Sequence, residues 1–378
     1  MRLVHIADAH LGYRAYNKVN SFGINAREAD VLAAFHEALD QTVKIKPDLI
    51  LIAGDLFHAV RPSNLIIYDS YRAFRSLRSR TDAPVVIIGG NHDSPRSADA
   101  GCILELLTTI DEIHVVHAEP KQLHFPALDV AVYCLPHNAL PFKSEFRIAP
   151  DPGSKYNILL AHARLEGMEK GFDRYFLTRD DVREEEWDYV AYGHLHSFHR
   201  VRSNAYHPGS IEFAGGLTVW EQFEKDPKKG FIEYDLESGR MERHHVKTRE
   251  IVPPLGIDAN GLTASEVDER IQSAIAGVPG GVSNKIVRLA VQNLPRAIRG
   301  DLDYSKIREV RAEALHFELD FPKPPDQSTL AQDGPARPLE QEWEEFGGSY
   351  PLPAGVARDR LLELGRQYLL AAQSWEDQ

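Results

Sequence analysis

Cysteine is nearly absent from the 378-residue sequence, which contains only Cys102 and Cys134. Two cysteines cannot form a disulfide framework, so we expect a fold held by its hydrophobic core and a reducing environment. Long hydrophobic runs are also lacking, because no stretch approaches the ~18 apolar residues of a membrane span. The first residues, Met1 to Asp8, are interrupted at once by polar side chains. We therefore expect no signal peptide, no membrane association and a cytoplasmic location.

An excess of basic charge is missing as well, since the formal net charge is −13. Taken alone, this value argues against a nucleic-acid partner. The charge is uneven, however: residues 301–378 hold 8 Lys and Arg against 16 Asp and Glu, whereas residues 1–100 hold 12 against 11. Because the acidity is concentrated near the C-terminal end, net charge neither supports nor excludes a DNA substrate.

The hydrophobic pattern predicts an α/β fold. Apolar, β-branched runs alternate with segments of helical spacing, which favours a largely parallel, layered sheet. The first half is predicted to contain strands at 2–7, 49–53 and 83–88, helices at 27–45 and 64–80, and a short helix at 101–110. Further strands are predicted at 113–117, 130–135, 156–160, 187–192 and 230–236, with a loop over 166–181 and a turn over 206–210.

Polar residues follow several of these predicted strands directly. Gly89-Gly90-Asn91-His92-Asp93 follows the strand at 83–88, Asp8-Ala9-His10 follows the first strand, and Gly54-Asp55 follows the second. Open α/β sheets place their ligand sites at this carboxyl edge. Each group alone has an ordinary alternative, such as an Asp in a turn beside a solvated histidine.

Histidines follow two later strands in the same way. His162 ends the run at 156–160, and Gly193-His194-Leu195-His196 follows the run at 187–192. Two imidazoles at i and i+2 in extended backbone share a face, which is typical of a metal site. A lone histidine such as His162 is more often structural.

Together these strand ends supply oxygen and nitrogen ligands and no thiolate. That chemistry suits two hard-to-borderline divalent ions, Mn²⁺ above all, with Mg²⁺ or Fe²⁺ as alternatives. Two ions ~3.5–4 Å apart can clamp the attacking and leaving oxygens of a phosphoryl transfer, and a non-ligand imidazole can protonate the leaving oxygen. The predicted ligands are Asp8, His10, Asp55 (as a bridge), Asn91, His162, His194 and His196, with His92 alongside.

These five motifs resemble those of the calcineurin-like metallophosphoesterases, and more narrowly those of the SbcD nucleases, bacterial relatives of the meiotic-recombination-eleven nuclease. The resemblance covers roughly residues 1–236. It implies a layered β-sandwich flanked by helices, a small α/β cap and a helical tail. It also implies one ion held by Asp8, His10, Asp55 and His196, and another held by Asp55, Asn91, His162 and His194.

The same resemblance implies an activity. It places His92 at the transition-state-stabilising or general-acid position and His58 near the scissile phosphate. The expected enzyme is a Mn²⁺-dependent DNA exonuclease and endonuclease, acting through a hydroxide between the ions in double-strand break repair. The expected partners are DNA (double-stranded ends, hairpins or single strands), an SMC-like ATPase of the SbcC type and a second copy of the chain. Ala9 departs from the family pattern, but it is not a ligand position.

Four segments are expected: a nuclease domain at 1–250, an α/β cap at 251–321, a Pro-rich linker at 322–338 and a partner-binding tail at 339–378. The cap is predicted to hold helices at 263–277 and 301–313 and strands at 284–292 and 314–321. The tail carries an apolar stripe at helical spacing, which either binds a groove on the partner or packs on the chain's own core. Its predicted partner-binding residues are Leu361, Leu364, Tyr368 and Trp375.

Contacts to DNA are predicted from basic and aromatic side chains near the site and in the cap. These are Tyr13, Arg14, Lys18, Arg61, Arg96, Lys285, Arg288, Arg296 and Arg299. The loop that holds the first three could equally be an ordinary amphipathic loop. Two other functions stay open: a mainly structural, DNA-tethering subunit, and a phosphoesterase that acts on a phosphoprotein or cyclic nucleotide.

Overall fold

The computed structural model describes residues 1–95, 101–168, 175–215, 218–296, 298–322, 343–344, 346–348 and 357–376. The chain separates into two compact units, Met1–Asp320 and Phe321–Gln378. Arg96, the side chain of Trp375 and nearly all of the predicted linker lie outside the described residues. No helix in these described ranges combines the length and the apolar content that a membrane crossing needs.

The first unit is built on two six-stranded sheets. The order in the first sheet is β14 (Arg240–His245), β13 (Gly230–Asp235), β1 (Arg2–Ile6), β2 (Leu49–Ile52), β3 (Val85–Ile88) and β4 (Ile113–Val116). Strands β1 to β4 run parallel, and β13 pairs antiparallel with β1, with Leu3 opposite Tyr234. The sequence therefore places the carboxyl ends of β1, β2 and β3 side by side.

The second sheet repeats this arrangement. Its order is β11 (His199–Arg202), β12 (Ala205–His207), β10 (Tyr189–Gly193), β7 (Tyr156–His162), β6 (Val130–Leu135) and β5 (Lys121–Phe125). The inner four strands are parallel, with Gly193 opposite His162, and the two edge strands are antiparallel. The short strands β8 (Arg164–Leu165) and β9 (Phe176–Leu177) form a separate pair.

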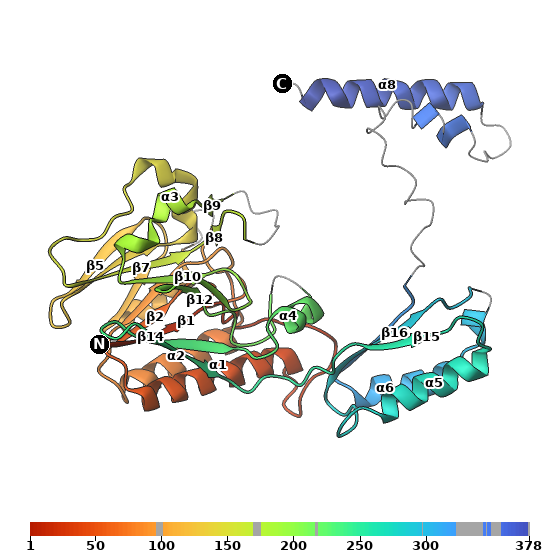
Figure 1. The fold of residues 1–378 in the computed structure, drawn as a ribbon, viewed down its shortest axis with the longest axis horizontal. Coiled ribbons are helices and arrows are strands. Elements are labelled where there is room, and N and C mark those ends of the chain that lie inside the picture. Colours follow the sequence, from red (N-terminus) through yellow and green to blue (C-terminus); the bar gives the residue numbers. More distant parts are fainter. Residues whose placement is uncertain are drawn as a thin grey trace. The chain divides into compact units, whose positions relative to one another are not determined.

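The sheets pack face to face between layers of helix (Figure 1). Helices α1 (Ala26–Ile45) and α2 (Asn64–Arg78) cover the outer face of the first sheet, and α3 (Arg179–Val182) lies beyond the second. Alternate residues of each inner strand enter different cores: Val4 and Ile50 contact the helix layer, whereas Leu3 and Leu51 contact the second sheet. Burial on both faces explains the uninterrupted apolar runs of these strands. The α/β sandwich predicted from the sequence is confirmed.

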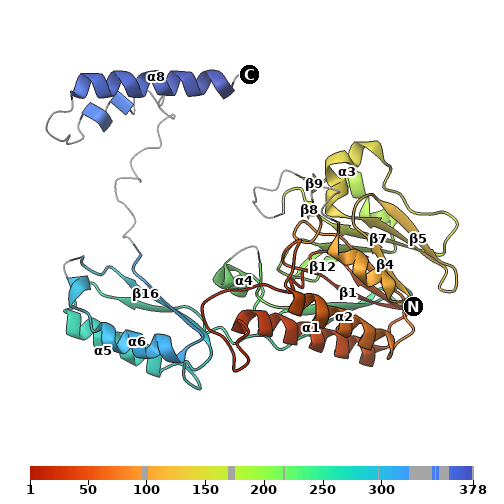
Figure 2. The same cartoon turned by 180° about the vertical axis from the view of Figure 1, so that it is seen from behind.

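A small three-stranded parallel sheet completes this unit. It orders β15 (Leu255–Asp258), β16 (Ile286–Gln292) and β17 (His316–Asp320), and helices α5 (Ala264–Ala276) and α6 (Tyr304–Glu313) lie along one face (Figure 2). Ile286 of β16 and Leu315, just before β17, pack with Phe213 and Trp220, which follow the second sheet in sequence. The segment predicted as a cap thus shares a core with the residues just after the two sheets.

Several sequence predictions are wrong at the edges of the sheets. The structure contains β5, β11, β14 and β15, which the sequence pattern did not reveal, and β12 occupies part of the predicted turn at 206–210. Edge strands alternate exposed and half-buried residues and lack the apolar runs of central strands, as the pattern of β14 shows. The predicted helix at 101–110 is a 3₁₀ helix, η2 (Ile103–Thr109), and the predicted loop at 166–181 contains β9 and the start of α3.

The second unit contains helix α8 (Arg358–Glu376). The indole Nε1 of Trp343 donates a hydrogen bond to Leu362 O over 3.0 Å, and its ring lies against Gly365, where a Cβ would be 2.2 Å away. Leu364 and Tyr368 are 38% and 75% exposed, whereas Leu361 is half-buried. Part of the predicted stripe is therefore covered within the unit, and part of it faces outward.

Candidate metal centre

The carboxyl ends of five strands from both sheets converge on one group of polar side chains. In the first sheet, Asp8 and His10 follow β1, Asp55 follows β2 and Asn91 follows β3. In the second sheet, His162 ends β7, and His194 and His196 follow β10. Four of these residues have positive φ values: 52° at Asp8, 49° at His10, 48° at Asp55 and 95° at His194. Positive φ is costly for residues other than glycine and persists only where the surroundings enforce it, as at functional sites.

One group of ligand atoms belongs to Asp8, His10 and His196, which could hold a metal ion between them. The Nε2 atoms of His10 and His196 lie 3.0 Å apart, and both rings are buried. Two ligands ~2.1 Å from one ion and at right angles to each other are about 3 Å apart, so the spacing suits an octahedral ion. The pKa of both imidazoles is lowered, chiefly by burial, which favours the neutral form that binds metals.

A second group surrounds His162. Its Nδ1 donates a hydrogen bond to Ala53 O over 2.8 Å, so the proton of the neutral ring is on Nδ1. The lone pair of Nε2 then faces Asn91 Oδ1 at 3.0 Å and Asp55 Oδ2 at 3.4 Å. Three acceptors directed at one point repel one another unless a cation or a proton lies between them. His194 Nδ1 is 3.1 Å from the same Asn91 oxygen.

Asp55 lies between the two groups. Its Oδ2 is 3.7 Å from His10 Nε2 and 3.4 Å from His162 Nε2, and its Oδ1 accepts a hydrogen bond from His92 N over 2.8 Å. Burial opposes its ionisation, but the neighbouring imidazoles of His162, His10 and His92 together outweigh burial and hold the Asp55 pKa well below its ordinary value. The same pair raises the pKa of His162 to about 10, because Asp55 overcomes the effect of burial on that ring. A carboxylate in this position can contact both groups.

Asp8 differs from Asp55, although both are fully buried. Burial raises the Asp8 pKa well above its ordinary value, and the charge of Asp55 adds to this. Its two oxygens accept the backbone N–H of His194 at 3.0 Å each. A cation beside these carboxylates would offset the cost of burying both as anions.

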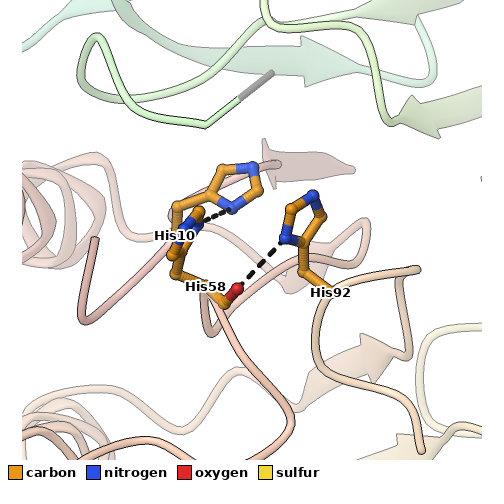
Figure 3. A group of neighbouring side chains, drawn as sticks. All are labelled: His10, His58 and His92. Carbon is orange, nitrogen blue, oxygen red and sulfur yellow. Dashed lines mark hydrogen bonds between the residues drawn. The ribbon is translucent and has the colours of Figure 1, made fainter. Parts of the chain in front are cut away.

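His58 and His92 lie beside the first group (Figure 3). His92 Nδ1 donates a hydrogen bond to His58 O over 3.0 Å, and His58 Nδ1 is 3.3 Å from His10 Nδ1. Because a carbonyl oxygen can only accept, His92 keeps a proton on Nδ1 and exchanges protons through Nε2. The two rings are stacked, with centroids 5.2 Å apart. These two imidazoles could alternatively join His10 as metal ligands.

Two glycines allow this close packing. A Cβ on Gly90 would lie 2.1 Å from Asp55 Oδ1, and a Cβ on Gly215, which has a φ of +67°, would lie 3.0 Å from both His10 and His196. Gly90 N also donates to Asp93 Oδ1 over 2.8 Å, which shapes the turn between them. Burial and then the charge of Asp55 raise the Asp93 pKa to about 7. Asp93 therefore organises the Asn91–His92 turn, a role that the motif alone did not assign.

The residues predicted to contact DNA near the site have protein partners. Arg14 pairs with Glu28, with their closest atoms 2.9 Å apart, and the Tyr13 ring packs edge-on against His58. Lys18 Nζ donates to Ala312 O over 2.5 Å and to Ala314 O, where α6 ends. These contacts fix the loop after His10, so a DNA contact by these residues stays a prediction.

Two of the cations predicted to contact DNA from the cap also form ion pairs within the protein. Lys285 pairs with Glu250 at 2.5 Å, and Arg288 pairs with Asp320 at 2.9 Å. Three other predicted contacts are exposed: Arg61, Arg296 and Arg299.

The sequence pattern missed one residue that lies beside the metal group. His137 lies two residues after the end of β6, as the first residue of the 3₁₀ helix η3 (His137–Glu145). Its ring centroid is 6.1 Å from that of His162 and 6.2 Å from that of His194. The available signal was the one used elsewhere, a histidine within a few residues of the end of a buried strand.

Two stacked mixed sheets with histidine, aspartate and asparagine side chains at their strand ends define a metallophosphoesterase-type fold. Residues 1–198, over half of the chain, match the family model described as calcineurin-like phosphoesterase. The chain belongs to the calcineurin-like phosphoesterase family, which implies divalent metal ions at this group of His and Asp residues.

Within this family, the chain is similar in sequence to proteins named Mre11. The chain is 28% identical over 202 residues, 52% of each chain, to a protein of Methanococcus maripaludis named DNA double-strand break repair protein Mre11. It is 27% identical over 270 residues to the Mre11 protein of Methanocaldococcus jannaschii, covering 67% of this chain and 68% of that one. The Mre11 protein of Sulfolobus acidocaldarius is 24% identical over 331 residues, covering 84% and 82%. The match to the first of these spans only about half of that relative's length.

Proposed function

We propose that this chain is a two-metal DNA nuclease that hydrolyses phosphodiester bonds in double-strand break repair. The observation that carries the proposal is the position of Asp55, with Oδ2 within 3.7 Å of imidazoles from both groups, His10 and His162. One ion would be held by Asp8, His10, Asp55 and His196, and the other by Asp55, Asn91, His162 and His194. The DNA substrate is supported by the similarity to Mre11 proteins, whose name refers to DNA double-strand break repair.

When bound, the two ions supply Lewis acidity at the phosphate and lower the pKa of the attacking water. Mn²⁺ is the ion we propose, because the ligands combine carboxylate, amide and imidazole. Proton transfer to the leaving group is assigned to side chains of the protein. His92 holds a proton on Nδ1 against His58 O, so its Nε2, when protonated, is the atom that can deliver a proton to the leaving oxygen. The stacked His58 ring restricts the rotation of His92.

The proposal is tested with purified protein and Mn²⁺ on end-labelled duplex, hairpin and single-stranded DNA. We expect cleavage with Mn²⁺, none with chelator, and cleavage at least ~100-fold slower with His92→Ala at matched protein concentration. As a control, His124→Ala removes an exposed histidine whose partner is Asp151, and it should cleave like wild type. Rapid hydrolysis of a phosphopeptide or cyclic nucleotide with no cleavage of DNA would favour the other phosphoesterase function. Tight DNA binding without any hydrolysis would favour a tethering role.

We also propose that the second unit binds an SMC-like ATPase of the SbcC type and that the enzyme acts as a homodimer. Leu364 and Tyr368 are exposed on α8, so an apolar groove of the partner can cover them. Leu364→Glu with Tyr368→Glu should abolish co-purification with such an ATPase and leave DNA cleavage by the chain alone unchanged. Exchange of the exposed Arg366 for Glu is the matched control and should preserve binding. A double variant that is insoluble, or that still binds the ATPase, would contradict this role.

A further inference from the structure

We infer that His137 is a positioning residue that holds His194, and through it the second ion, in place. This inference rests on the two-metal function proposed above. The segment that contains His137 comes from β6 of the second sheet, whereas the turn that contains Asn91 comes from β3 of the first. Asn91 and His194 must meet at one ion although they lie on different sheets. A connection between these two sheet edges is therefore needed at this point.

The backbone and side chains of the β6 end supply that connection. His137 N donates a hydrogen bond to Gly89 O over 3.0 Å, and Asn138 Nδ2 donates to Pro95 O over 3.0 Å. These two bonds hold both ends of the turn that contains Asn91. The position of the Asn91 amide relative to the second sheet is thus set by consecutive residues at the end of β6.

The His137 ring acts on the other side of the same ion. It lies nearly parallel to the His194 ring, with centroids 6.2 Å apart and planes at 19°, and it meets His162 edge-on at 75°. His194 is half-buried and has a φ of 95°, a conformation that a residue with a side chain adopts only when its neighbours enforce it. Asp8 fixes the backbone N–H of His194, and His137 lies against its ring.

A side chain that orients a ligand changes metal affinity without touching the metal. Loss of such a partner typically lowers affinity or activity by 10–100-fold. Because His137 contacts His162 and His194 and lies beside the Asn91 turn, its removal should weaken the second ion. The first ion, at His10 and His196, should keep its affinity. The His137 and His194 rings face each other, so phenylalanine should replace histidine with little loss of this contact.

The experiment is a titration of the full chain with Mn²⁺ alone, by calorimetry and by electron paramagnetic resonance, without DNA. We expect two ions in wild type and in His137→Phe, and one of two ions weakened by about 10–100-fold in His137→Ala. The exposed His124→Ala is the matched histidine control and should bind both ions normally. Thermal melting establishes that each variant is folded. If His137→Ala does not fold, His137→Leu, which keeps an apolar side chain but removes the flat ring, tests the same contact and should also weaken one ion.

The outcomes separate this inference from the proposed function. Wild-type affinity for both ions in His137→Ala, or equal weakening of both ions, would overturn the positioning role. Weakening in His137→Phe as strong as in His137→Ala would also overturn it, because a ring nitrogen would then be the important group. If wild type itself binds fewer than two ions, the proposed two-metal function fails instead.

Discussion

Replacement of Gly90 by alanine should displace the Asp55 carboxylate, which we propose bridges the two ions. A Cβ at this position would lie 2.1 Å from Asp55 Oδ1, 2.7 Å from Asp55 Cγ and 2.4 Å from Asp55 N. Since side-chain and backbone atoms of Asp55 both block the methyl group, a rotamer change cannot relieve the clash, and one of the two strand ends must shift by about 1 Å. Overpacking of this kind costs about 1–3 kcal/mol.

The functional loss should exceed the loss of stability. Metal sites depend on ligand positions within ~0.5 Å, so a shift of this size should reduce Mn²⁺ binding and lower DNA cleavage by ~100-fold or more. The assay combines thermal melting, Mn²⁺ titration and single-turnover cleavage. Gly256→Ala is the matched control, because no atom lies within 4 Å of its Cβ position in β15. It should be as stable as wild type or about 0.5–1 kcal/mol more stable. A Gly90→Ala protein with wild-type affinity for both ions would refute the reasoning.

Three further predictions concern single side chains. His92→Ala should bind both ions and DNA but cleave at least ~100-fold more slowly, and loss of metal from this variant, measured by elemental analysis, would show that His92 is a ligand. Asp55→Asn should lower the content of both ions, whereas His10→Ala should lower mainly one, and full metal content in Asp55→Asn would exclude a bridge. Arg27 is buried and donates a hydrogen bond to Glu212 over 3.1 Å. Arg27→Met should therefore lower the free energy of unfolding by about 3–5 kcal/mol, because Glu212 would be left buried without its partner. Arg80→Ala, which removes an exposed pair with Asp40, should lower it by about 0–1 kcal/mol, and denaturant unfolding measures both.

The central strands and their polar ends could be predicted because a local signal encodes them. Residues 49–53 and 83–88 are apolar throughout, as strands buried on both faces must be, and the structure has β2 and β3 there. The order of those strands then brings Asp55 and Asn91 to one edge without any further information. The edge strands lack this signal, since β5 has half-exposed residues that also suit a loop.

Long-range partners could not be predicted in this way. Lys18 has the sequence context of a phosphate-binding lysine, but its amine bonds to the end of α6, almost 300 residues later in the chain. The loop after His10 therefore contacts the segment predicted as a cap through Lys18, and the Tyr16 ring stacks on His316 with centroids 3.9 Å apart. Such contacts depend on how separately encoded elements pack, and no spacing rule reports them. His137 combines both situations: its position shortly after a buried strand is a local signal, as for the predicted ligands, but its contacts with His162 and His194 depend on packing.

The central claim is that two ions share Asp55, and anomalous diffraction from crystals grown with Mn²⁺ tests it most directly. Data collected at the manganese absorption edge should show two peaks about 3.5–4 Å apart. One should contact His10 and His196, the other His162 and Asn91, and both should contact the Asp55 carboxylate. A single peak, or two peaks of which one lies away from Asp55 and contacts His58 and His92, would contradict the account.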